Sequence, residues 1–160
     1  MRTGVALALA GLVLAGAAQA AESGCDKLAW NLDAERTLIA SASTGDAKAA
    51  PPLARRLAMK PLAEAGLPKP PERTPREASA LAGFATVSVP EAGLYRVTLD
   101  AEGWLDVVQA GAYRRADAFT GVRDCPGIRK SVKFRLDAGE ATIQVTGTAP
   151  TIGLAVTREK

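Results

Sequence analysis

The sequence predicts a mainly β protein: an antiparallel β-sandwich or jelly roll of about seven strands, preceded by a short helical N-terminal segment. Apolar and polar residues alternate in short runs over residues 83–157, which is the period of a strand with one buried and one wet face. Turn-forming residues separate the runs, and no helical crossover segment interrupts them. A single open sheet would leave its apolar face uncovered, so two packed sheets are expected.

The first stretch has the plan of a secretory signal peptide over residues 1–20. Arg2 precedes an apolar run at residues 5–15, and Ala18, Gln19 and Ala20 form a small-residue cleavage site. The run is too short to span a bilayer. We therefore expect cleavage after Ala20, a periplasmic or secreted protein, and no stable membrane insertion.

Residues 21–66 are expected to form a helical N-terminal segment packed on the sandwich. A first helix is predicted over residues 32–40, with Asn31 or Asp33 as its N-cap. A second is predicted over residues 53–59, because the preceding Pro51 and Pro52 suit a first helical turn. One face of the first helix carries an apolar stripe made of Ala34, Leu38, Ile39 and Ala42.

Residues 67–82 form a proline-rich linker to the sandwich module, residues 83–160. Four prolines between residues 68 and 75 predict an extended polyproline-type segment. Such a segment can be a ligand for an aromatic groove, but a stiff spacer along the sandwich surface is the expectation here.

Cys25 and Cys125 are the two cysteines of the chain. They predict a structural disulfide that ties the N-terminal segment to the sandwich, since thiols oxidise outside the cytosol. A redox or metal-binding pair is the alternative, but neither a C-x-x-C spacing nor a histidine accompanies them.

Charge and composition limit the chemistry. The full chain has 20 basic and 17 acidic residues, and removing residues 1–20 leaves 19 basic and 17 acidic residues. A net positive charge of this size is too small for a nucleic-acid binder. No histidine is present, so the usual general base and the commonest metal ligand are missing. No metal or other cofactor is expected, and a carboxylate pair on the loops is the remaining catalytic alternative.

The densest functional candidate is the region 104–130, where aromatic and charged residues surround the second cysteine. An exposed indole beside polar groups is typical of sugar and peptide sites, and clustered arginines can bind anions. Alternatively, the indole faces the core or lies under the N-terminal helix, and nearby aspartates neutralise the arginines. The predicted ligand-binding residues are Trp104, Asp106, Tyr113, Arg115, Arg123, Asp124 and Arg129.

Several motifs resemble a group of small exported proteobacterial proteins without an established function. They are CDKLAW at residues 25–30, LAEAGLP at 62–68, GLYRV at 93–97, WLDVV at 104–108, FTGVRDCPGIRKSV at 119–132 and IGLAV at 152–156. Some of that group carry a ring-cleaving dioxygenase label, whose histidine-containing iron site a chain without histidine cannot supply. GLYRV and FRLDAG, at 134–139, also resemble pre-peptidase C-terminal β-sandwich domains, which implies a non-catalytic accessory or binding module.

These observations favour an exported, non-catalytic binding module for a glycan, a peptide or an envelope protein. An inhibitor or assembly partner of an envelope hydrolase, acting through the disulfide loop, is the first alternative. A carboxylate-based hydrolase is the second.

Overall fold

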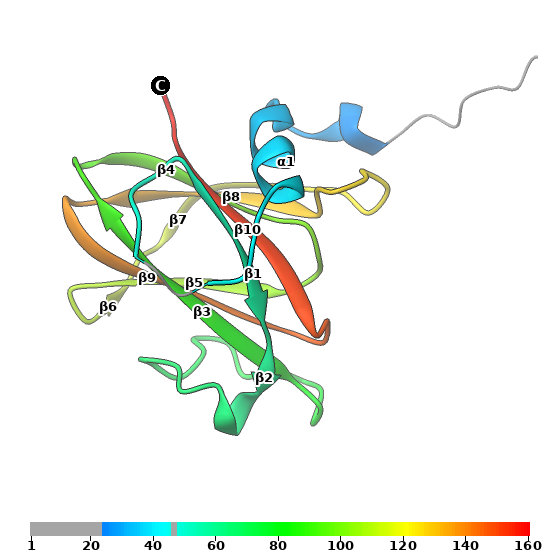
Figure 1. The fold of residues 1–160 in the computed structure, drawn as a ribbon, viewed down its shortest axis with the longest axis vertical. Helices are drawn as coiled ribbons and strands as arrows, with labels where there is room; N and C mark the ends of the chain where they lie inside the picture. Colours follow the sequence, from blue (N-terminus) through cyan, green and yellow to red (C-terminus); the bar gives the residue numbers. More distant parts are fainter. Residues whose placement is uncertain (1–23, 46–47) are drawn as a thin grey trace, which may run out of the picture.

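The computed structural model describes residues 24–45 and 48–160, and in these residues it confirms the predicted fold class. Two antiparallel sheets of five strands pack face to face, with one short α-helix outside them (Figure 1). The sandwich therefore has ten strands where about seven were expected. The predicted signal peptide, residues 1–20, lies outside the described residues.

The first sheet has the strand order β1-β10-β4-β8-β7. Its strands are β1 (Leu53–Ala58), β10 (Thr151–Arg158), β4 (Gly93–Leu99), β8 (Lys130–Leu136) and β7 (Ala116–Gly121). The second sheet has the order β2-β3-β9-β5-β6. Its strands are β2 (Lys60–Pro61), β3 (Leu81–Val89), β9 (Gly139–Gly147), β5 (Trp104–Gln109) and β6 (Ala112–Tyr113).

The core lies between the sheets and is built from the alternation seen in the sequence. Val97 in β4, Leu154 in β10 and Ile143 in β9 are fully buried, as the period-2 pattern predicts. Tyr95 is buried as well, and its hydroxyl donates a hydrogen bond of 2.8 Å to the carbonyl of Glu91. The inward face of each long strand is therefore confirmed.

Helix α1 (Asp33–Ala40) confirms the first predicted helix and packs on the outer face of the first sheet, against β1 and β10 (Figure 1). A short 3-10 turn, η1 (Gly24–Lys27), precedes it. The buried face of α1 carries Ile39 together with the charged Glu35. Its N-cap is Leu32 and not Asn31 or Asp33; the Asn31 side chain instead accepts a hydrogen bond from the Asp33 N–H at 2.9 Å.

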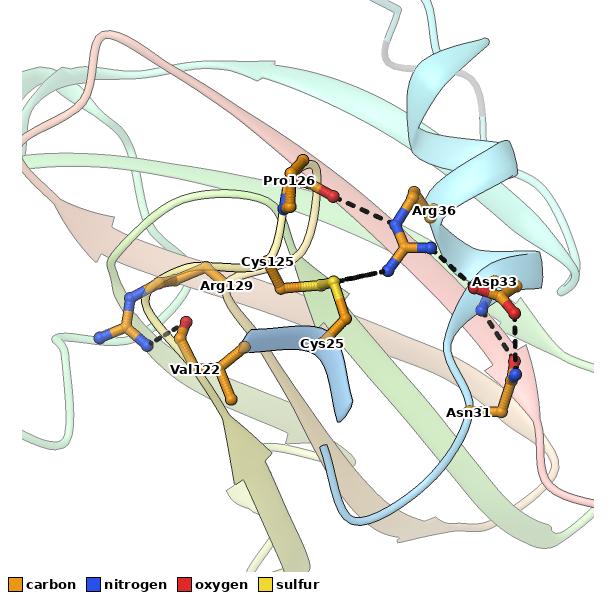
Figure 2. The surroundings of a disulfide bond; sticks show 8 residues. All are labelled: Cys25, Asn31, Asp33, Arg36, Val122, Cys125, Pro126 and Arg129. Atoms are coloured by element: carbon orange, nitrogen blue, oxygen red, sulfur yellow. Dashed lines mark hydrogen bonds and ion pairs between the residues drawn. A yellow bond between two sulfur atoms is a disulfide. The ribbon is translucent and has the colours of Figure 1, made fainter. Parts of the chain in front are cut away.

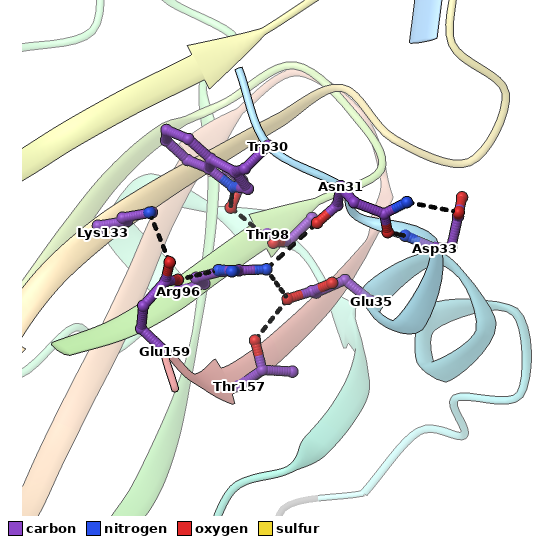
Figure 3. Close-up of polar contacts among 10 residues, drawn as sticks. Trp30, Asn31, Asp33, Glu35, Arg96, Thr98, Lys133, Thr157 and Glu159 are labelled. Atoms are coloured by element: carbon purple, nitrogen blue, oxygen red, sulfur yellow. Dashed lines mark hydrogen bonds and ion pairs between the residues drawn. The ribbon is translucent and has the colours of Figure 1, made fainter. Parts of the chain in front are cut away.

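A polar network joins α1 to the outer face of the first sheet (Figure 3). The Glu35 carboxylate accepts a hydrogen bond from the Thr157 hydroxyl at 2.5 Å and lies 3.4 Å from the Arg96 guanidinium. Arg96 also pairs with Glu159, which receives a second bond from Lys133 at 2.8 Å. These contacts hold the pKa of Glu159 at about 2, first through the Arg96 hydrogen bond and then through Lys133.

The helix predicted over residues 53–59 is wrong, because this stretch contains β1. Leu53 and Leu57 face the core and Arg55 shares their side, so the alternation is broken by a single charged residue. Leucine, alanine and arginine all favour helices locally, and tertiary pairing with β10 overrides that preference. The sheets also include strands that precede residue 83, namely β1, β2 and the start of β3.

The stretch of residues 112–119 is divided between the two sheets. β6 pairs with β5 in the second sheet, and after Arg114 and Arg115 the chain enters β7 of the first sheet. This crossing lies on one side of the sandwich. A further 3-10 turn, η2 (Leu62–Glu64), follows β2, and no helix among the described residues is long and apolar enough to cross a membrane.

Candidate functional site

A large groove in the described part of the chain lies where the chain crosses between the sheets. β6 pairs only with Val108 and Gln109, so within the described residues the first half of β5 has β9 on one side and no strand on the other. On the first sheet, β7 is the edge strand and pairs only with β8 within the described residues. The sandwich is therefore open here, and a groove of about 990 Å³ enters between β5 and β7.

The floor of the groove is apolar. Leu105, Val107, Val132 and Phe134 line it and belong to the hydrophobic core. Phe119 of β7 pairs across the sheet with Val132 and shares its face, yet 62% of its surface is exposed. The second sheet has no strand opposite Phe119, so a large ring remains uncovered at the mouth of the groove.

One wall of the groove is formed by the end of the proline-rich segment and the residues after it. Residues 68–75, which we call the strap, lie across the outer face of the second sheet. The Gln144 side chain binds both backbone groups of Lys69, at 3.0 Å each, and Asp106 accepts the Glu72 N–H at 3.0 Å. Residues 72–77 then line the groove.

Trp104 lies at the groove with 38% of its surface exposed, so the alternative that places its indole in the core is wrong. The indole N–H donates to the Asp106 carboxylate at 2.7 Å, and the Arg73 guanidinium lies 5.3 Å from the ring centroid. Asp106 is buried and accepts bonds on both oxygens. Stacking a sugar on this indole would require Arg73 to move.

Tyr113 lies beside the same strap. Its hydroxyl donates to the carbonyl of Pro70, and the Lys69 ammonium lies 5.0 Å from its ring centroid. Desolvation raises the pKa of the Tyr113 phenol, and the nearby charges of Asp106 and Glu72 add to the effect. Tyr113 therefore holds the strap through contacts that its ring and hydroxyl already use.

Two cations stand at the ends of β7. Arg115 directly precedes the strand, and Lys130 pairs across the sheet with Gly121 at its other end. Both line the groove, and neither forms an ion pair with a carboxylate of the described residues. Burial lowers the pKa of the Lys130 ammonium, with Glu102 opposing that shift and Arg129 adding to it.

The remaining three predicted residues lie at the disulfide loop and do not line the groove. Asp124 accepts the Gly24 N–H through its backbone carbonyl at 2.9 Å. Arg129 donates to the carbonyl of Val122 at 3.1 Å and pairs with Glu102, through which it reaches the groove wall. Arg123 precedes them on the same loop.

The predicted disulfide between Cys25 and Cys125 is present. The Arg36 guanidinium of α1 lies over it, with contacts of 3.3 and 3.1 Å to the two sulfur atoms (Figure 2). Arg36 also donates to the carbonyl of Pro126 at 3.1 Å. The loop tip is thus fastened to the helix, and the disulfide has a structural role.

The predicted site is therefore divided. Trp104, Asp106, Tyr113 and Arg115 come together at the groove, while Arg123, Asp124 and Arg129 surround the disulfide. Sequence reasoning did not assign the floor of the groove, because its residues are indistinguishable in pattern from core residues. A large ring in a short, otherwise polar strand was the signal available for Phe119. Phe119 and Lys130 lie in the candidate region 104–130 but were not among the predicted ligand-binding residues, and Val132 and Phe134 lie outside that region.

Four carboxylates line the groove, from Glu72, Glu77, Glu102 and Asp106. Asp106 is occupied by the indole and by the strap, and Glu102 pairs with Arg129. Within residues 24–45 and 48–160, no group of three histidine, cysteine, aspartate or glutamate side chains could hold a metal ion.

Comparison with protein-family models, curated proteins and solved structures finds no match to this chain.

Proposed function

We propose that this protein is an exported, non-catalytic binding module that holds an extended peptide segment of an envelope protein in the groove. The observation that carries the proposal is the opening of the sandwich between β5 and β7, with Phe119 exposed above an apolar floor. Exposed large rings beside a concave apolar surface are typical of binding sites and not of inert protein surface.

The strap supports a peptide over a glycan. It is itself an extended peptide that this face of the protein already binds, through a side-chain amide, a carboxylate and an aromatic hydroxyl. The groups that a sugar would need are engaged, because the Trp104 N–H binds Asp106 and Arg73 covers part of the ring. The apolar floor and Phe119 remain available.

The polar groups of the groove also favour a binding role over catalysis. The most buried carboxylate, Asp106, accepts two hydrogen bonds within the protein. The chain has no histidine to act as a base. The groove otherwise offers apolar contact and charged side chains of both signs, among them Arg115, Lys130, Glu72 and Glu77.

Site-specific photo-crosslinking tests the proposal. A benzophenone amino acid replaces Phe119 at the groove or, as a matched control, Phe84, which is 38% exposed on the outer face of the second sheet. We expect crosslinks to a polypeptide from position 119 and not from position 84, in cells that export the protein.

Identical products from both positions, or none from position 119, would contradict the proposal. An array of envelope glycans run in parallel tests the competing ligand class. Glycan binding that disappears in Trp104→Ala would overturn the peptide assignment.

A further inference from the structure

The outer edge of β7 has the backbone groups of an edge strand. β7 (Ala116–Gly121) pairs with β8 on one side, and no described strand pairs with its other side. Edge strands present unpaired N–H and C=O groups at alternate residues, which another extended chain can satisfy. The outer face of β7 is held by the N-terminal segment, since the Ala29 N–H donates to the Thr120 hydroxyl at 2.9 Å.

The inner face of the same strand is open to the groove. A strand added beside β7 would direct every second side chain into the space between the sheets, next to Phe119. The whole groove, which also extends past Trp104 and Asp106 on the outer face of the second sheet, has a volume of about 990 Å³, and its floor includes Val132 and Phe134. It lies at the upper end of ligand-pocket volumes, about 300–1,000 Å³, so it accommodates more than one apolar side chain.

The charges around β7 are suited to an acidic partner. Arg115 stands at the start of the strand and Lys130 at its end, without carboxylate partners among the described residues. Their neighbours Arg114 and Arg129 are different, because they pair with Asp137 and Glu102. Arg115 and Lys130, which form no ion pair among the described residues, are about one strand length apart, where they would meet carboxylates that flank a bound segment.

The geometry points to strand addition: a segment of a second polypeptide, with alternating apolar residues and acidic residues at its ends, pairs with the free edge of β7 and fills the groove. This inference rests on the proposed function and specifies how the peptide is held. The first half of β5, which also faces the groove, is shorter than β7 and lies beside the residues that follow the strap. The longer edge is therefore the one that receives the added strand.

A random twelve-residue peptide library on phage, selected against the oxidised protein, tests the inference. We expect enriched peptides to alternate apolar and polar residues and to carry Asp or Glu near both ends. Phe119→Ala and Arg115→Glu should each weaken the binding of a synthetic peptide of enriched sequence by about tenfold. Phe84→Ala and Arg123→Glu, which lie outside the groove, are the matched controls and should leave the affinity unchanged.

Backbone pairing is tested separately with the same peptide. Methyl groups on alternate backbone nitrogens remove hydrogen-bond donors and keep every side chain, so strand addition predicts a loss of binding of about tenfold or more. Amide hydrogen exchange in β7 should slow when the unmodified peptide binds.

The outcomes separate this inference from the proposed function. Peptides that bind in a Phe119-dependent way but lack alternation, or tolerate the methylated backbone, would overturn strand addition and leave peptide binding in place. If selection on the natural protein enriches no peptides beyond those enriched on the Phe119→Ala variant, both strand addition and the proposed peptide binding would be overturned.

Discussion

Breaking the disulfide should destabilise the protein strongly without unfolding it. The bridge joins Cys25 and Cys125 across a separation of 100 residues. In the chain-entropy model, closing a loop of this length removes unfolded-state freedom worth roughly 4.7 kcal/mol. The N-terminal segment should remain folded, because Leu32 and Ile39 are buried in a cluster with Ile128.

For a domain of this size, that free energy corresponds to a fall in melting temperature of roughly 15 to 20 °C. The perturbation is the double variant Cys25→Ala with Cys125→Ala, chosen because Cys125 is buried and serine would place a hydroxyl there. Thermal unfolding followed by circular dichroism measures the shift. Hydrogen exchange in α1 should rise as well, since Arg36 loses the sulfur atoms that it contacts.

Reductant provides the control. It should lower the melting temperature of the natural protein to that of the double variant and leave the double variant unchanged. A melting temperature that falls by less than about 3 °C after complete reduction would refute the entropic explanation, because such a fall is smaller than that expected for even 1 to 2 kcal/mol. Free thiols in the untreated protein would refute the bridge itself.

Three further predictions concern other parts of the structure. The Arg96 hydrogen bond and then Lys133 lower the pKa of Glu159 from 4.5 to about 2, so the stability that this carboxylate contributes is complete above pH 4.5 and is lost as the pH falls toward 2. Between these pH values, the melting temperature of Glu159→Gln should therefore fall less steeply with decreasing pH than that of the natural protein. Gly153→Ala should destabilise by about 1 to 3 kcal/mol or more in urea unfolding, because the added Cβ would lie 2.5 Å from Cγ2 of Ile39 on α1; an unchanged midpoint would contradict the close packing. Asp106→Ala removes the carboxylate that accepts the strap's N–H group, so limited trypsin digestion should cut the strap about tenfold faster while the melting curve stays cooperative.

The sequence predicts the strands well where one face of a strand is uniformly apolar. Val132, Phe134 and Leu136 alternate with polar residues, and all three face the core. β1 escaped prediction because Arg55 occupies an inward position between two leucines, which removes the alternation and leaves a helix-like composition. The local pattern is a poor predictor of secondary structure in such a segment, because the pairing that makes it a strand is with residues about 100 positions further along the chain.

The candidate site was predictable only in part, for a topological reason. Trp104 and Asp106 occupy adjacent outward positions on one strand, so their proximity follows from the period of the strand. Phe119 and Trp104 belong to different sheets, and their shared groove depends on which strands end at the open side. Arg123 is close to these residues in the sequence and was therefore predicted to share their site. It lies after β7, in the loop that the disulfide holds, and does not line the groove.

The strand order also determines when this chain can fold. Each long ladder contains β8, β9 or β10: β10 lies between β1 and β4, β9 between β3 and β5, and β8 between β4 and β7. The strands that precede residue 130 form only two-residue pairings among themselves. Neither sheet can therefore form its long ladders before β8, β9 and β10 are available, and removing these strands would remove the interior of both sheets and not an edge. Because every long ladder pairs segments that are far apart in the sequence or waits for β8, β9 or β10, we expect folding to be slow for a domain of this size.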